Sequence, residues 1–96
     1  MATGDVTAVS VALVTANYTL LADGATVATV GIQLDYSGVP IRIAFAAAAP
    51  AVNSDDYLVL SQKIPPFREA LSAATQVWGL PLFDSATKAR VYRIAR

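Results

Sequence analysis

The chain has 96 residues, of which 55% are hydrophobic and only 15% are charged, and its seven Lys or Arg residues balance seven Asp or Glu residues. A chain of this length holds one hydrophobic core, so we expect a single β domain over residues 1–96 and exclude an enzyme with separate cofactor and substrate domains. His and Cys are both absent. The commonest general base, the commonest metal ligand and the thiol nucleophile are therefore missing, which argues against an enzyme and against a bound cofactor or metal.

Period-two alternation predicts strands through the first half of the chain. These runs cover residues 6–14, 17–22, 25–30, 31–36 and 39–45. The first run is apolar at both parities, which predicts a strand that is buried on both faces or lies at an interface. Asp23-Gly24 predicts a hairpin with a type I′ turn, and Ser37-Gly38 predicts a second hairpin. Pro40 lacks an amide hydrogen, so we expect it at a strand start or on an edge.

The second half of the chain is less regular. Pro50 predicts that the strand ends in the Ala-rich segment 46–49 and that a loop follows. Pro66 can occupy the first position of a helix, so one short helical turn is expected near residues 66–73. Further strands are expected over residues 57–61, 75–83 and 87–95.

Regularly spaced short strands with turn residues between them indicate an all-β fold. About six to eight strands at this spacing are typical of a small antiparallel sandwich or barrel rather than of an α/β unit.

The apolar content is high for so small a domain, and the mean hydropathy is +0.51. A core of this size covers only part of such a sequence, so other protein is expected to cover the rest, as a homo-oligomer or as a subunit of an assembly. The longest uncharged run, residues 6–22, carries too many polar residues for a membrane span. Because no Lys or Arg precedes Arg42, we expect no signal peptide.

Charge is divided unevenly along the chain. Residues 1–40 hold three acidic and no basic residues, whereas residues 41–96 hold all seven basic residues and four acidic ones, so the two parts carry −3 and +3. The C-terminal strand is especially basic, which predicts either an edge strand kept soluble by its charges or a contact with acidic groups of a neighbouring subunit. Zero net charge argues against a nucleic-acid partner.

Aromatic residues lie close to these arginines in the last third of the chain. Trp, Tyr and Arg are enriched in the energetically dominant part of interfaces, so this third is the candidate partner surface. Trp78 has the alternative of a place in the core. The predicted interface residues are Phe67, Trp78, Phe83, Arg90, Tyr92, Arg93 and Arg96.

One loop has the composition of a cation site. Asn53, Ser54, Asp55 and Asp56 are oxygen-rich and adjacent, and they could bind a hard cation. Their spacing matches no EF-hand, so a solvated turn is the preferred interpretation.

Several segments in this order resemble small β-rich virion proteins of tailed bacteriophages. The segments that carry the resemblance are 17–21, the turn at 37–38, the strand 41–45 with Ala49-Pro50-Ala51, the Trp strand 76–80 and the closing strand 88–94. The resemblance spans residues 9–95, and the segment 65–69 departs from it.

The resemblance implies a non-enzymatic structural subunit that is made in the host cytoplasm and then sits on the capsid surface. The most specific expectation is a head decoration, or cement, protein that forms a homo-oligomer, with a trimer favoured, and binds the major capsid protein or other virion subunits. A neck or tail adaptor, and a fibre module that binds a host receptor or glycan, remain as alternatives.

Overall fold

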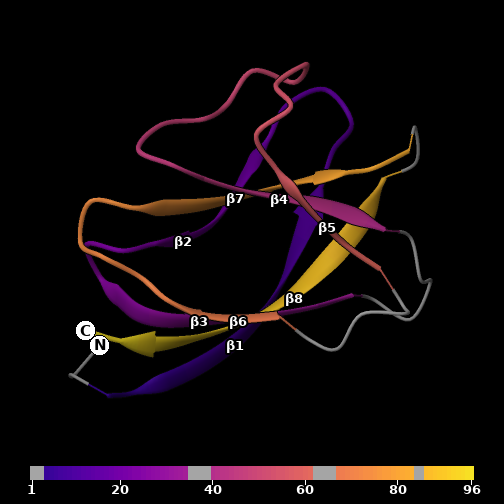
Figure 1. Cartoon of the computed structure of the whole chain (residues 1–96). Helices are drawn as coiled ribbons and strands as arrows, with labels where there is room; N and C mark the ends of the chain where they lie inside the picture. The colour runs from indigo at the N-terminus through magenta and orange to yellow at the C-terminus, as the bar shows by residue number, and fades with distance from the viewer. Residues whose placement is uncertain (1–3, 35–39, 62–66, 84–85) are drawn as a thin grey trace.

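The computed structural model describes residues 4–34, 40–61, 67–83 and 86–96. Within these residues the chain forms eight strands and no helix, which confirms the predicted all-β antiparallel class (Figure 1). The strands are β1 (Val6–Leu13), β2 (Thr19–Asp23), β3 (Val27–Leu34), β4 (Ile41–Ala46), β5 (Leu58–Leu60), β6 (Phe67–Ala70), β7 (Gln76–Pro81) and β8 (Thr87–Ala95).

The strands form two four-stranded sheets that pack face to face. The first sheet has the order β1-β8-β3-β6 and the second has the order β2-β7-β4-β5. The pairs β1·β8, β2·β7, β3·β6 and β4·β5 make one long antiparallel ribbon, which rolls up so that β8 also pairs with β3 and β7 with β4. This order is that of an eight-stranded jelly roll.

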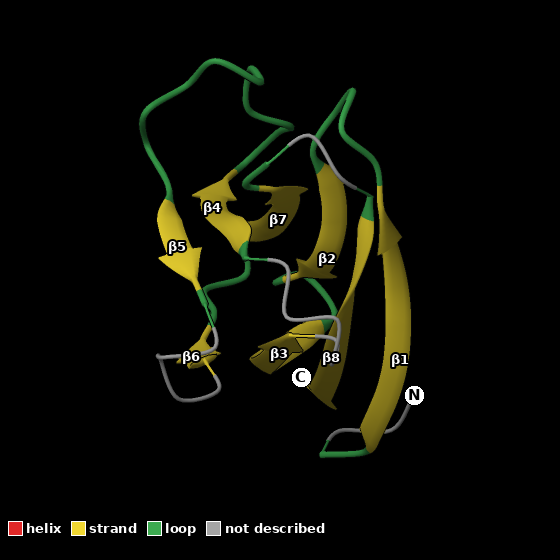
Figure 2. Ribbon diagram, turned by 90° about the vertical axis from the view of Figure 1, so that its right-hand side faces the viewer, coloured by secondary structure: helices red, strands yellow, loops and turns green. Residues whose placement is uncertain are grey.

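Apart from β4 and β5, consecutive strands lie in opposite sheets, and this corrects the predicted hairpins. Gly24 lacks the positive φ that a type I′ turn requires. A Cβ on Gly24 would overlap the carbonyl oxygens of Ser72 and Thr75, and the Gly24 amide donates to the Thr75 oxygen at 2.8 Å. The glycine is therefore used for close approach to another loop, and the chain crosses there from β2 to β3 in the other sheet (Figure 2). The turn at 37–38 lies outside the described residues, but β3 and β4, which flank it, are likewise in different sheets.

Two predictions on strand position each lose one of their alternatives. Strand β1 is an edge strand that is largely exposed, with Val6 at 65% exposure, so it is not buried on both faces of its sheet, and its place at an interface stays a prediction. Strand β8 is not an edge, because it pairs with β1 on one side and β3 on the other. The pairing of distant segments decides which strand is central, and hydropathy along the chain does not report it.

The helical turn expected near residues 66–73 is absent from the described part of that segment. Residues Phe67–Ala70 are extended and pair with β3, and Leu71 continues the pairing when its amide donates to the Ala28 oxygen at 2.8 Å. The open edge of β3 satisfies these backbone groups, so tertiary pairing overrides the local helix signal.

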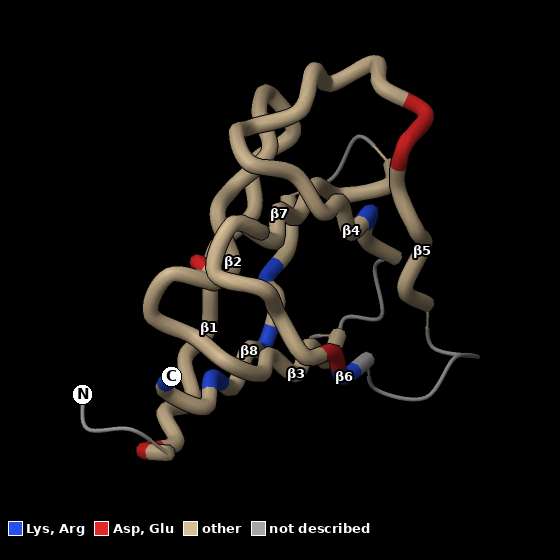
Figure 3. Tube along the Cα trace, turned by 60° about the vertical axis from the view of Figure 1, so that its left-hand side comes forward, with Lys and Arg blue, Asp and Glu red and all other residues tan. Residues whose placement is uncertain are grey.

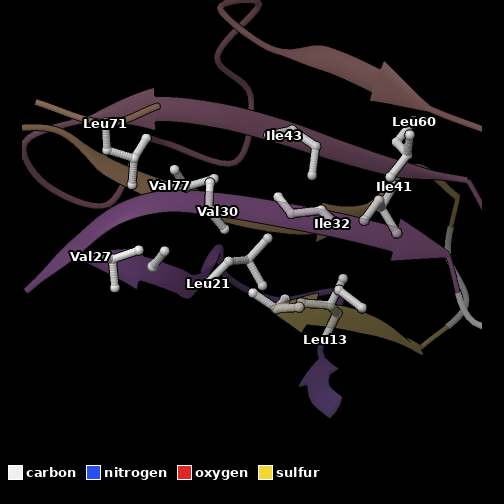
Figure 4. Close-up of a cluster of buried hydrophobic side chains, with 13 residues drawn as sticks. Leu13, Leu21, Val27, Val30, Ile32, Ile41, Ile43, Leu60, Leu71 and Val77 are labelled. Carbon is white, nitrogen blue, oxygen red and sulfur yellow. The ribbon is translucent and has the colours of Figure 1, made fainter. Parts of the chain in front are cut away.

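The main core lies between the sheets and is made of side chains at alternating strand positions (Figure 4). Leu21 and Val30 are fully buried and face each other from opposite sheets. Period-two alternation predicts Ile41, Ile43 and Phe45 on one face of β4 and Arg42 on the other. Ile41 and Ile43 are buried as predicted, whereas Phe45 is 38% exposed. The core side chains come from both sheets and are Leu13, Leu21, Ala22, Val27, Val30, Ile32, Ile41, Ile43, Leu60, Leu71, Val77, Ala89 and Val91.

The neighbouring residues Leu20 and Leu21 test this packing with one substitution each. Leu21 has no exposed surface, whereas Leu20 is 39% exposed on the other face of the second sheet. We expect Leu21→Ala to lower the free energy of unfolding by about 2–5 kcal/mol, and Leu20→Ala to lower it by less than about 1.5 kcal/mol. Urea denaturation measures both values, and equal losses would contradict the packing described here.

Candidate functional site

Two predicted interface residues, Arg90 and Tyr92, lie on the outer face of the first sheet. In the register, Tyr92 is opposite Ala8 of β1 and Gly31 of β3, and Arg90 is opposite Ser10 and Gln33 on the same two strands. A depression of about 360 Å³ opens between them. Its rim is formed by Ala8, Ser10, Gln33, Arg90 and Tyr92, and Val9, Ile32 and Val91 also line it.

The position of the Tyr92 ring depends on Gly31. A Cβ at position 31 would overlap three atoms of the ring, so the half-buried tyrosine crosses over the glycine backbone. Only glycine leaves room for this arrangement. The sequence showed Tyr92 and Gly31 separately, but it held no signal that a strand pairing would place them together.

Arg93 and Arg96 both donate hydrogen bonds to backbone carbonyl oxygens of the same chain, Arg93 from a half-buried and Arg96 from an exposed position. The Arg93 guanidinium donates from Nε and Nη2 to the Leu21 carbonyl oxygen at 2.9 and 2.6 Å. Arg96 donates to the carbonyl oxygens of Gly24, at 2.8 Å, and Leu71. Both arginines therefore connect the end of β8 to other parts of the same chain. The sequence had instead suggested that they contact acidic groups of a neighbouring subunit.

Trp78 lies on the outer face of the second sheet, outside the main core. It is half-buried, and its indole nitrogen donates to the Ala46 oxygen at 3.4 Å. It belongs to a small cluster with Tyr18, Ala44, Leu80 and Tyr57. The Arg42 guanidinium lies 4.7 Å from the centre of the Tyr57 ring, in cation–π geometry.

Two buried polar groups in this region lack hydrogen bonds within the described structure. These are the Tyr18 hydroxyl and Nε of Arg42. Burial raises the pKa of Tyr18 above its ordinary value of 10.0, and the nearby charge of Arg42 lowers it by a smaller amount. The proximity of the cation thus offsets only part of the desolvation of the phenol.

Phe83 follows β7 and is 64% exposed. It borders a second depression, of about 490 Å³, together with Arg42, Tyr57 and the loop 52–55. In this loop the Asp56 amide donates to the Ser54 hydroxyl at 3.2 Å, a local turn of the kind that Ser and Asp favour. No group of three or more acidic residues in the described part of the chain could hold a metal ion.

The structure does not bring the predicted interface residues together. Arg90 and Tyr92 lie on the outer face of the first sheet, Trp78 lies on the outer face of the second, and Arg93 and Arg96 are engaged internally. Phe67 begins β6, at the edge of the first sheet. The described residues of this set are therefore divided between the two sheets, and an interface role for each of the seven stays a prediction.

Sequence reasoning missed an apolar surface along β4 and β5. Strand β5 is the edge of the second sheet, and its Leu58 and Val59 are 55% and 38% exposed. Phe45, at the end of β4, is 38% exposed. Phe45 and Leu58 border a depression of about 350 Å³ that reaches residues 69–72 and Thr75. We call Phe45, Leu58 and Val59 the β5 edge surface, in which Phe45 and Leu58 lie on the core-facing side of the second sheet and Val59 lies on its outer side. Figure 2 shows β5 and β6 on the same side of the sandwich.

No protein-family model, curated protein sequence or solved structure matches this chain significantly. The likeness to phage virion proteins therefore stays a prediction from the sequence. Among the described residues, no helix is long and apolar enough to cross a membrane.

The internal role of Arg93 predicts a loss of stability when its guanidinium is removed. Arg93→Gln leaves the Leu21 carbonyl oxygen without its donor, so we expect the free energy of unfolding to fall by about 1–3 kcal/mol. Lys88→Gln on the same strand removes an exposed charge and should change it by less than about 0.5 kcal/mol. Thermal denaturation of both variants measures the difference, and equal values would show that the Arg93 hydrogen bonds add no stability.

The buried phenol of Tyr18 predicts a stability that depends on alkaline pH. Because the pKa of Tyr18 is higher in the folded than in the unfolded chain, keeping this phenol neutral contributes to the free energy of unfolding. This contribution is complete below the ordinary pKa of 10.0 and is lost as the pH rises through the folded-state pKa. Tyr18→Phe should raise the free energy of unfolding at pH 7 by about 1 kcal/mol, because it removes an unsatisfied buried hydroxyl. Urea titrations between about pH 8 and 11 compare the variant with the wild type, and an unchanged alkaline slope would contradict the assignment.

Proposed function

We propose that the protein is a structural subunit of a virion that associates with copies of itself and decorates a phage head. The observation that carries this proposal is the β5 edge surface, where large apolar side chains lie beside a strand edge that pairs with no other strand among the described residues. Monomeric proteins usually protect such edges with charges, proline, a covering segment or a short strand, and β5 is three residues long. Residues 57–61 contain no charged side chain, so this edge has no such charge.

A second copy of the chain suits this edge. An uncharged strand can pair with its own copy without like charges meeting across the ladder. The depression beside Phe45 and Leu58 offers space for apolar side chains from the partner copy. Self-association through β5 would cover apolar surface that the domain's own core leaves exposed, as the composition leads us to expect.

The remainder of the proposal draws on the sequence resemblance and on fold-level analogy. Jelly rolls build many viral capsid proteins, but they also occur in lectins and cupins, so the fold alone assigns no function. The sequence contains neither His nor Cys, which favours a binding role over a catalytic one. A decoration protein on the capsid surface agrees with the jelly-roll fold and with a binding role. Its partners would be other copies of this chain and the major capsid protein.

A charge placed on the β5 edge surface should prevent self-association. We expect the wild-type chain to form an oligomer, a trimer by the resemblance, and Leu58→Lys to be a folded monomer, because a lysine there would be desolvated in the contact. Light scattering after size-exclusion chromatography measures the mass of each, and circular dichroism checks the fold.

Val6→Lys is the matched control. It places the same charge at a 65% exposed valine on β1, at the opposite edge of the sandwich, and should leave the oligomer intact. A monomeric wild-type chain at millimolar concentration, or an oligomer that survives Leu58→Lys, would contradict association through β5.

The virion role needs a test of location. Immunogold labelling of purified phage particles that carry this chain should place label over the whole head. Label confined to the neck or tail would favour an adaptor, label on fibres would favour a receptor-binding module, and particles without label would refute the virion assignment.

A further inference from the structure

We infer that one loop end of the sandwich binds an acidic peptide segment of another protein, in the depression that Arg42 and Phe83 border. A carboxylate of the peptide pairs with the Arg42 guanidinium, and a nearby apolar side chain packs on Phe83. This inference goes beyond the proposed self-association and concerns a different partner, so either can fail without the other.

Three separate segments of the chain build this site. The depression of about 490 Å³ is lined by Thr15 from the loop between β1 and β2, by residues 52–55 from the loop between β4 and β5, and by Phe83 after β7. Figure 2 shows the β1–β2 and β4–β5 loops at the same end of the sandwich. Loops that a rigid β framework holds together are common binding surfaces.

The fold positions the Arg42 side chain. Its neighbours Ile41 and Ile43 are buried in the core, which fixes the strand and leaves Arg42 on the outer face of the second sheet. The guanidinium lies 4.7 Å from the centre of the Tyr57 ring, and its Nη1 donates to the Val52 oxygen at 3.2 Å. The group that would bind a ligand is therefore already ordered, which lowers the entropy cost of binding.

No carboxylate neutralises Arg42 among the described residues. Its partners are a carbonyl oxygen and an aromatic ring, which are both uncharged, and within the described structure its buried Nε has no hydrogen bond. Arg93, by contrast, donates from both Nε and Nη2 to a carbonyl oxygen. A guanidinium has more N–H donors than Arg42 uses, and their planar arrangement matches a carboxylate. An acidic ligand group would supply the missing negative charge.

The rest of the lining suits a peptide. Phe83 is 64% exposed and offers an apolar surface to a side chain. Thr15 and Asn53 supply side-chain donors and acceptors for a peptide backbone. The depression is open to the surface, so it can receive side chains of an extended segment, whereas a site for a small molecule usually encloses most of its ligand.

Acidic residues beside the depression favour a ligand with a single carboxylate. Asp55 lines the depression and Asp56 follows it, and both are exposed. Figure 3 shows this acidic stretch in the loop before β5. A polyanion such as a nucleic acid would be repelled there. A peptide can instead place one carboxylate against Arg42 while a backbone N–H donates to Asp55.

An NMR titration of the isotope-labelled full chain with acetyl-Phe-Ala-Glu-Ala-amide, the Glu peptide, tests the site. The Phe and Glu side chains of this peptide lie on one side when it is extended. We expect shift changes at Arg42, Tyr57 and Phe83, and an affinity at least about fivefold higher than for the same peptide with Gln in place of Glu, the Gln peptide. The Glu peptide in reverse order is titrated in parallel, so that both chain directions are sampled.

Three variants separate the roles of the lining residues. Arg42→Gln should weaken binding of the Glu peptide by about tenfold and leave binding of the Gln peptide unchanged, so that the preference for the acid is lost. Phe83→Ala should weaken binding of both peptides by about threefold and keep the preference. Asp55→Asn removes a negative charge beside the ligand and should strengthen binding of the Glu peptide by about twofold.

Arg68→Gln is the matched control. It removes the same side chain from an exposed position on β6, in the first sheet, and should leave both affinities within about twofold of the wild type. Leu58→Lys, which is designed to prevent self-association, should bind the Glu peptide at least as tightly as the wild type. Loss of the oligomer and loss of the peptide site are thus told apart, and circular dichroism confirms that each variant is folded.

Three results would overturn the inference: no shift change at Arg42 or Phe83 with either peptide order, equal affinity for the Glu and Gln peptides, or an affinity that Arg42→Gln leaves unchanged. Tighter binding of a tetranucleotide of dT than of the Glu peptide, with a loss of this binding in Arg42→Gln, would also overturn it and would assign the depression to nucleic-acid phosphates.

Discussion

The placement of β8 between β1 and β3 is the constraint on which the rest of the structure depends. Backbone pairing on both edges holds this strand in the centre of its sheet, so its side chains must alternate strictly between the core and the outer face. Ala89, Val91 and Ala95 seal the core from one side. The outward-facing positions carry Arg90 and Tyr92, which border the depression on that face. A slip of one residue would exchange these two sets, which would bury Arg90 and expose Val91.

The basic residues of the C-terminal segment consequently have different roles. Arg93 occupies an inward parity but reaches the carbonyl oxygen of Leu21 in the opposite sheet, where it joins the two layers at the edge of the core. Arg96 donates to the carbonyl oxygen of Gly24, where the chain crosses from β2 to β3 in the other sheet. Arg90, three residues before Arg93, is exposed on the sheet face. A charge-rich strand can thus be structural at one position and exposed on the sheet face at another, and the parity of each position decides which.

The sequence by itself determined the class of the fold, the position of most strands and the alternation within them, because period two and turn residues are local signals. The boundaries of β8 and the outward direction of Arg42 follow from that pattern. Only the tertiary structure decided that Asp23-Gly24 crosses between sheets, that β8 is central and that residues 67–70 are extended. It also decided which surfaces exist, since Tyr92 and Gly31 are distant in sequence and meet only through strand register. Strand pairing is a non-local choice that satisfies backbone hydrogen bonds and core packing together, and no single segment encodes it.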